Sequence, residues 1–375
     1  MKRKTVRRAG VLCVLLCVIL LFCGCEGGLS AYAPSLTVSA AEFVLPDDSF
    51  SFSPSFARVA LSLCSGHTAE RTRTLAEKAG FSVNIQKNYE KPAEDVSHTS
   101  GYTVASRVMN DRGTERLLVL VIFRGTEDGE WASNFDFSPS GKEDAVFSEN
   151  FLLAAQDALQ DVQSVAGQSE NPLFVVAGHS RGGGCANLFG VLLNACYGAE
   201  NVFCYTFAAP ATVRGDLPVA CENIFNIINP VDVVPYMPLA SWGYRRVGQD
   251  ILLNADMENR MTVQTVVYTL SEISADVPSY YEVRHSLTDA GESENGLTAF
   301  EVMLLFSSAL TSLESSDALP SVALPEISPK SDFASLANLW KAAMAENGRL
   351  GMELLKQHLP VVYDRLLAVY EKENG

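Results

Sequence analysis

Positive charge is scarce in this 375-residue sequence, because 28 Lys and Arg residues stand against 44 Asp and Glu residues. The formal net charge at pH 7 is −16. A chain this acidic has no general attraction for the phosphate backbone of nucleic acids, and anionic membrane surfaces repel it. The charge balance therefore argues against nucleic acid as a partner.

Cysteine and histidine are also few, with nine and five residues, and no pair of them has the spacing of zinc ligands. After residue 40 five cysteines remain: Cys64, Cys185, Cys196, Cys204 and Cys221. The number is odd and several lie within apolar runs, which does not suit a disulfide framework. We expect small core residues rather than disulfides, and no metal site.

Long apolar runs are missing except near the start of the chain. Five basic residues within the first eight positions precede an uninterrupted apolar run over residues 11–22. This order is typical of an export signal, and the run is shorter than the roughly 18 apolar residues that indicate a membrane-spanning helix. We expect an exported protein that is secreted or held at the cell surface.

The way in which the N-terminal segment is processed stays open. Small residues at Val38-Ser39-Ala40 suit cleavage by a signal peptidase, which would remove residues 1–40. The sequence F-C-G-C (residues 22–25) is an alternative site, with Cys25 as a lipid-anchored residue. A third interpretation keeps residues 11–25 as a membrane anchor.

The composition, 47% hydrophobic and 19% charged, is that of a globular protein with a sizeable core. Short apolar runs rich in Val, Ile and Phe predict strands buried on both faces at 117–123, 173–177, 202–207 and 224–228. Residues 151–166 and 182–197, which lie between these runs, have helical spacing. This alternation predicts an α/β fold with a parallel sheet and crossover helices.

Flanking segments extend this pattern. Residues 58–80 are expected to form one helix, and residues 82–115 a hairpin or meander at the edge of the sheet. A further helix is predicted over 257–275. Pro360 should kink or divide the helical periodicity of residues 333–370.

The predicted strand 173–177 runs into Gly178-His179-Ser180-Arg181-Gly182, and a helix is expected to follow. The pattern G-x-S-x-G between a buried strand and a helix is typical of a nucleophile elbow. The glycines are required because a side chain at either position would clash with the strand or the helix. The alternative is a glycine-rich helix start that only packs closely. The context favours Ser180 as a nucleophile.

A serine nucleophile needs a base, which an acid orients, and in this fold the order along the chain is serine, acid, histidine. Only His285 and His358 follow Ser180 at a distance. His285 comes between a short predicted strand, 280–284, and a polar loop, and is the predicted base. His358 lies in a Leu-rich helical stretch just before Pro360, where we expect a surface or packing role.

Asp232 is the predicted acid. It follows the apolar run 224–228 within N-P-V-D-V-V-P (residues 229–235), and the two prolines stiffen that turn. The alternative is an ordinary turn aspartate.

Acyl transfer also needs donors for the oxyanion. The backbone N–H of Arg181, directly after the nucleophile, is one expected donor. The other is Thr126, at the end of F-R-G-T (residues 123–126) after the first predicted strand. Taken alone, that segment is only a turn that ends a strand.

The motifs F-R-G-T, G-H-S-R-G-G, F-A-A-P and N-x-x-D-x-V-P, in this order, resemble the class 3 lipase family, which includes fungal triacylglycerol lipases. The similarity covers roughly residues 57–290. The resemblance implies an α/β-hydrolase fold, with a mostly parallel central sheet and helices on both faces. It also implies the triad Ser180, Asp232 and His285, an oxyanion hole at Thr126 and Arg181, and hydrolysis of acyl esters, commonly of lipids, without a cofactor.

We therefore expect a serine hydrolase that cleaves acyl esters such as acylglycerols through an acyl-enzyme. Triad chemistry suits a thioesterase or an acyltransferase equally, and the fold also suits a non-catalytic surface binding protein. The expected division is a signal or anchor region (1–40), a catalytic domain (41–311), a Ser- and Pro-rich linker (312–332) and a helical extension (333–375). The oligomeric state is not indicated.

Overall fold

The computed structural model describes residues 36–89, 100–125, 147–167, 169–214, 221–229, 231–232, 234–236, 244–254 and 356–374. The chain divides into two compact units. The larger unit comprises Pro34–Ile228, Val234–Leu253 and Pro360–Gly375; the smaller unit comprises Met1–Ala33, Asn229–Val233 and Asn254–Leu359.

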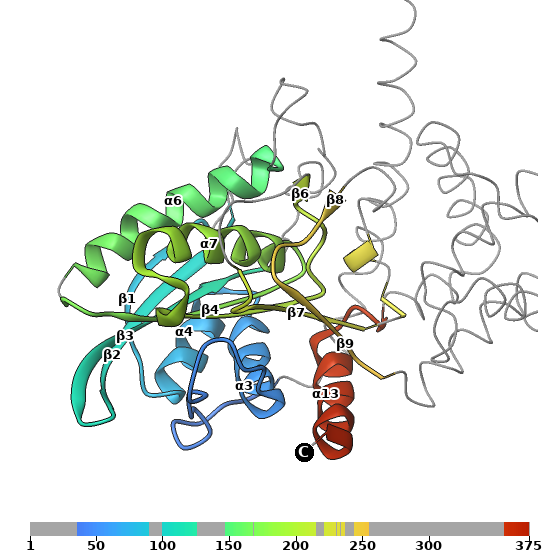
Figure 1. Cartoon of the computed structure of the whole chain (residues 1–375), viewed down its shortest axis with the longest axis horizontal. Helices are drawn as coiled ribbons and strands as arrows, with labels where there is room; N and C mark the ends of the chain where they lie inside the picture. The colour runs from blue at the N-terminus through green and yellow to red at the C-terminus, as the bar shows by residue number, and fades with distance from the viewer. Residues whose placement is uncertain are drawn as a thin grey trace, which may run out of the picture. The chain divides into compact units, whose positions relative to one another are not determined.

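A seven-stranded sheet forms the centre of the larger unit, with the strand order β1-β2-β3-β4-β5-β7-β9 (Figure 1). The strands are β1 Ser82–Lys87, β2 Tyr102–Asp111, β3 Thr114–Phe123, β4 Leu173–His179, β5 Val202–Phe207, β7 Ile224–Ile228 and β9 Gln249–Leu252. The pairs β1–β2 and β2–β3 are antiparallel, and all pairs from β3 to β9 are parallel. The carboxyl ends of β3, β4, β5 and β7 therefore meet at one edge of the sheet.

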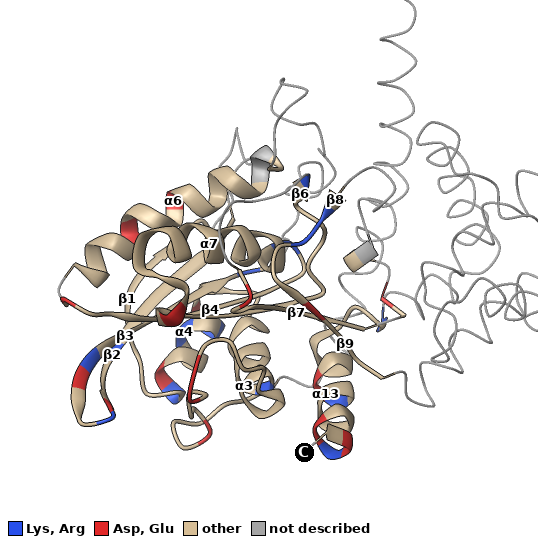
Figure 2. Cartoon of the chain, in the orientation of Figure 1, with Lys and Arg blue, Asp and Glu red and all other residues tan. Residues whose placement is uncertain are grey.

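Helices cover both faces of this sheet (Figure 1). One face carries α6 (Glu149–Ala166) and α7 (Arg181–Tyr197); the other carries α3 (Pro54–Cys64), α4 (Ala69–Lys78) and α13 (Pro360–Asn374). Every residue of β4, β5 and β7 is buried. Figure 2 shows the positions of Lys, Arg, Asp and Glu mainly along the helices, in loops and toward strand ends. Burial on both faces explains why these strands are continuous apolar runs.

Smaller elements connect this framework. Strands β6 (Val213–Arg214) and β8 (Tyr244–Arg245) form a separate antiparallel pair. Short 3-10 helices span Ala199–Asn201 and Val234–Tyr236.

The predicted α/β fold is confirmed, with all four apolar runs forming strands and both intervening segments forming helices. The antiparallel meander expected over 82–115 is also confirmed at the edge of the sheet, where β1, β2 and the start of β3 pair. The structure differs over 58–80, where two helices replace one. The hydroxyl of Thr68 accepts from the N–H of Arg71 (3.2 Å) and begins α4, because threonine is a good N-cap.

The described cysteines are mostly core residues, as expected. Cys64, Cys185, Cys204 and Cys221 are buried, Cys196 is exposed, and none of these five forms a disulfide. Burial raises the pKa of the Cys64 and Cys204 thiols.

Several sequence-based predictions fall on other residues. The export signal, the helix over 257–275 and the linker at 312–332 lie outside the described residues, so the predicted domain boundaries stay predictions. Within the described ranges, no helix is long and apolar enough to cross a membrane.

The C-terminal tail divides at Pro360, which is the first residue of α13. Proline suits this position because its missing N–H would have no partner within the helix. The helix buries Val362, Tyr363, Leu366 and Leu367, and packs against α3. Arg58 of α3 donates from Nε to Asp364 Oδ1 at 2.8 Å. The C-terminal helix is thus packed onto the framework of the larger unit.

Replacing Leu366 by Ala should lower the free energy of unfolding by about 3 kcal/mol, because it leaves a cavity at a fully buried position. Val369, on the same helix but only partly buried, is the matched control, and Val369→Ala should cost about 1 kcal/mol or less. Urea denaturation of both variants measures the difference. Equal stability of the two variants would show that α13 is not docked as described.

Candidate active site

Ser180 lies between the last residue of β4 and the first residue of α7, at the expected turn. Its backbone has φ 58° and ψ −126°, a conformation that costs a non-glycine residue about 1–3 kcal/mol. The N–H of Ser180 donates to the carbonyl of Phe207 (2.9 Å), and its carbonyl accepts from the N–H of Gly184 (3.1 Å). The end of β5 and the first turn of α7 thus hold a strained serine in place.

The glycines around Ser180 are sterically required. A Cβ on Gly178 would overlap the carbonyl of Gly182, and a Cβ on Gly182 would overlap the carbonyl oxygens of Phe123 and Arg124. These neighbours are backbone atoms of the sheet and the elbow itself, so they have little freedom to move. The structure thus gives the same steric reason for the glycines as the sequence pattern.

Arg181 begins α7 and is buried. Its guanidinium carbon lies 5.5 Å from the centroid of the Phe151 ring on α6. The side chain therefore packs between the two helices, and the role expected of this residue in oxyanion binding belongs to its backbone N–H, at the positive end of a helix.

The loop after β3 is held by a buried arginine. Arg124 donates from its backbone N–H to the carbonyl of Gly101 (2.8 Å), from Nη1 to Gly125 (2.8 Å) and from Nη2 to Asn88 (3.1 Å). Thr126, the second predicted oxyanion donor, comes next in the chain and lies outside the described residues. The hydrogen bonds of Arg124 therefore hold the chain in place up to Gly125, the residue before Thr126.

Asp232 is completely buried in the turn that follows β7. Its N–H donates to the carbonyl of Asn229 (3.1 Å), whose own side-chain oxygen accepts from Val231 (3.1 Å). The Asn229 side-chain amide donates to the carbonyl of Gln357 (2.9 Å). Within the smaller unit, this asparagine joins the aspartate turn to the residues that precede α13.

The histidine paired with Asp232 is His358. Its Nδ1 lies 2.8 Å from Asp232 Oδ2, and its side chain is 11% exposed. A carboxylate on Nδ1 fixes the tautomer that has Nε2 as the proton acceptor. His358 is therefore neither a surface residue nor an apolar packing residue, contrary to our expectation.

His285, the base predicted from sequence, lies outside the described residues. The structure thus brings Asp232 together with His358, for which the sequence pattern predicts a surface or packing role. The missed signal is Pro360: a residue before proline is disfavoured in a helix, so the Leu-rich periodicity has to break beside His358. A loop residue there follows both the serine and the aspartate in chain order.

Comparison with known proteins now adds to this geometry. The family model of class 3 lipases matches residues 120–242. The chain is related to the class 3 lipases. The lipase match begins within β3, contains Ser180 and Asp232, and ends before His358. Together with the observed sheet and elbow, this relationship identifies the fold as that of the α/β-hydrolases.

Two curated relatives of this lipase-like chain come from fungi. Secreted mono- and diacylglycerol lipase A from Penicillium cyclopium and from Penicillium camembertii are each 25% identical over 189 residues, 48% of this chain. The chain spans 59% of the length of these curated relatives.

Similar solved structures include two fungal lipases. Rhizomucor miehei triacylglyceride lipase is 17% identical, with a TM-score of 0.40 over 52% of this chain and 78% of its own. The lipase from Rhizopus microsporus var. chinensis is 14% identical, with a TM-score of 0.39 over 60% of this chain and 85% of its own.

Proposed function

We propose that this protein is an exported serine hydrolase that cleaves carboxylic esters of lipids such as acylglycerols. The observation that carries the proposal is the strained Ser180 turn between β4 and α7, within the segment that matches class 3 lipases. A strained non-glycine residue persists only where the surroundings enforce it, and such residues cluster at functional sites.

In the proposed mechanism Ser180 is the nucleophile, His358 the base and Asp232 the acid. Ser180 Oγ attacks the ester carbonyl while His358 Nε2 takes its proton. The backbone N–H of Arg181, and donors from Thr126, hold the oxyanion. His358 then protonates the departing alcohol, and water hydrolyses the acyl-enzyme by the same steps in reverse.

Chain connectivity supports His358 in this mechanism. Asp232 follows the last residue of β7 by four positions, and His358 precedes the first residue of α13 by two. Strands β4 and β7 are parallel and separated only by β5, so the chain leaves both at the same edge of the sheet.

A contact within the larger unit adds to this support. The ring of Tyr363, in the first turn of α13, lies 6.0 Å from the ring of His179, which directly precedes the nucleophile. The first turn of α13 therefore lies close to the residue that precedes Ser180. His358 precedes Tyr363 by five positions.

The relatives support the substrate class and the destination of the protein. Their names describe secreted lipases of mono- and diacylglycerols, and the basic and apolar start of this chain is typical of an export signal. We extend both properties to this protein. The exported protein is either secreted, after loss of residues 1–40, or held at the cell surface through Cys25 or residues 11–25.

The proposal is tested with purified protein and a panel of mono-, di- and triacylglycerols, with matched thioesters beside them. A fluorophosphonate should label Ser180 within the tryptic peptide of residues 143–181 and should stop ester turnover in proportion to the label. Heat-denatured protein is the control for non-specific labelling. Absence of label at Ser180 would reject the nucleophile, and turnover of thioesters alone would reject the substrate class.

A further inference from the structure

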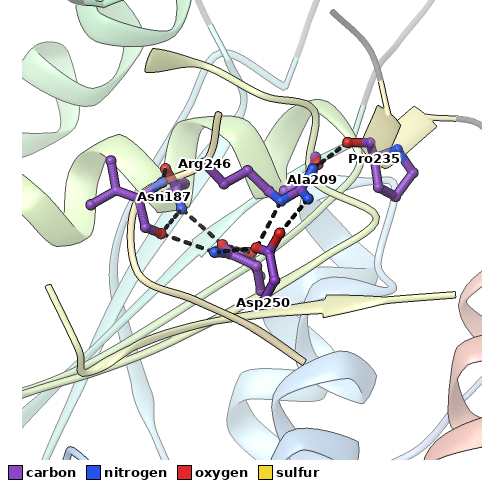
Figure 3. A network of polar contacts seen from close by, with 8 residues as sticks. Asn187, Ala209, Pro235, Arg246 and Asp250 are labelled. Carbon is purple, nitrogen blue, oxygen red and sulfur yellow. Dashed lines mark hydrogen bonds and ion pairs between the residues drawn. The ribbon is translucent and has the colours of Figure 1, made fainter. Parts of the chain in front are cut away.

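Arg246, between β8 and β9, makes contacts to three different turns or strands (Figure 3). Its side chain is 9% exposed. Nε and Nη2 donate to Asp250 Oδ1 and Oδ2 at 3.1 and 2.6 Å, which is a bidentate ion pair. Nη1 donates to the carbonyl of Ala209 (3.2 Å) and to the carbonyl of Pro235. One guanidinium thus joins three separate segments of the larger unit.

The first of these segments supports the nucleophile. Ala209 follows β5, whose last residue, Phe207, accepts the hydrogen bond from the N–H of Ser180. Ala208 between them has φ 52°, a left-handed conformation that alanine rarely adopts. A Cβ on Gly183 would lie 3.0 Å from Ala209 Cβ, so this turn also touches the start of α7. The turn over residues 207–209, itself strained at Ala208, therefore supports the strained backbone of Ser180 through the Phe207 carbonyl.

The second segment continues from the acid. Pro235 is the middle residue of the 3-10 helix Val234–Tyr236, and it follows Asp232 by three residues. Proline has a fixed φ, so a bond to its carbonyl constrains the path of the chain on both sides. Arg246 therefore holds the 3-10 helix that follows Asp232 along the chain.

The third segment anchors the guanidinium to the core. Asp250 Oδ1 also accepts from Asn226 Nδ2 on β7 (3.1 Å). Asn226 Oδ1 in turn accepts from Asn187 of α7 and from Thr206 of β5, both at 2.8 Å. These three partners are almost completely buried, and buried polar networks of this kind specify one arrangement. Asp250 thereby fixes the plane in which the Arg246 donors point.

We propose that Arg246 is a positioning residue, which holds the support of the Ser180 turn in register with the 3-10 helix Val234–Tyr236. The inference rests on the proposed function. The positioning role requires an arginine at this position. Only a planar guanidinium binds a carboxylate through two nitrogens on one edge while its third nitrogen donates to carbonyls. A lysine at this position keeps the charge but not this fixed fork of donors.

Arg246→Lys is the test, and Arg116→Lys is its matched control. Arg116 is 12% exposed and makes bonds of the same kind, to Asp111, Asn171, Pro172 and Asn201. These partners lie at the opposite end of the strands, beside the first residues of β4 and β5. Both variants lose a similar set of hydrogen bonds, but only Arg246→Lys alters the two turns of the proposed site.

Active enzyme is counted by fluorophosphonate titration, so that kcat refers to folded protein alone. Arg246→Lys should lower kcat by about 10- to 100-fold with KM within two-fold of wild type, because small misplacements of catalytic groups have effects of this size. The rate of labelling at Ser180 should fall by a similar factor. Arg116→Lys should leave both rates within two-fold while lowering the denaturation midpoint by a similar amount.

Asp250→Asn gives a second, milder variant, since it keeps the shape of the carboxylate but removes its charge. Its kcat should lie between those of wild type and Arg246→Lys. A kcat for Arg246→Lys equal to that of Arg116→Lys would overturn the positioning role. If wild type neither turns over esters nor labels at Ser180, the proposed function fails instead, which is a separate result from the comparison of variants.

Discussion

His358→Ala should lower kcat for ester hydrolysis by roughly 10⁴- to 10⁶-fold, as loss of the base does in triad enzymes. The reason is that Nδ1 of His358 lies 2.8 Å from the buried carboxylate of Asp232, so that its Nε2 is the nitrogen left to accept the serine proton. The measurement is kcat on a soluble short-chain ester, together with the rate of fluorophosphonate labelling. Both should fall while KM changes little.

His285→Ala is the matched control, because it removes the other histidine that follows Ser180 at a distance. We expect its kcat to stay within two-fold of wild type. Asp232→Asn should lower kcat by about 10⁴-fold, since an amide favours the wrong imidazole tautomer. A large loss in His285→Ala with near-normal activity in His358→Ala would return the role of base to His285.

The strained turn at Ser180 could be predicted from sequence because its determinants are local. Residues 173–177 of β4 are an apolar run because both faces of the strand are buried. Gly178 and Gly182 are fixed by contacts within a few residues of Ser180 or with the adjacent strand. Patterns of this kind are encoded by residue type and spacing. The parallel arrangement of the strands could be predicted from the alternation of apolar runs and helical segments.

The pairing of Asp232 with His358 could not be predicted in this way. The two residues are separated by 126 positions, and nothing in the composition around either one identifies its partner. A histidine in a Leu-rich helical pattern has the appearance of a packing residue until the break at Pro360 is taken into account. Contacts across such a distance depend on the tertiary fold, which periodicity does not report.

The burial of two arginines was missed for a related reason. Arg246 stands in a short polar stretch, where charged residues are normally solvated, yet its side chain is 9% exposed. Arg124 within F-R-G-T is likewise buried, with its donors directed at backbone carbonyls. Sequence identified the turns of the site but not the side chains that hold these turns in place.

The second large effect expected is that of Gly182→Ala, which tests the packing of the nucleophile turn against β3. The new methyl group would overlap the backbone carbonyls of Phe123 and Arg124, neither of which is a flexible side chain that can move aside. Overpacking typically costs about 1–3 kcal/mol and more where the backbone has to shift. We expect the free energy of unfolding to fall by about 3 kcal/mol or more, with kcat at least about 100-fold lower because the oxyanion donors move.

Alanine substitutions at two further glycines provide a graded comparison of the loss in stability. A Cβ on Gly183 would lie 2.9 Å from the Phe207 carbonyl and 3.0 Å from Ala209 Cβ, a milder clash. Gly167 ends α6 with a helical φ of −61°, and a Cβ there would lie 3.1 Å from the carbonyl of Gln163, so Gly167→Ala should change stability by less than about 1 kcal/mol. Urea denaturation should therefore rank the losses Gly182 > Gly183 > Gly167. A Gly182→Ala protein as stable as Gly167→Ala would mean that the Ser180 turn does not pack against the end of β3. The strained backbone of Ser180 would then lack the support on which its proposed role as nucleophile depends.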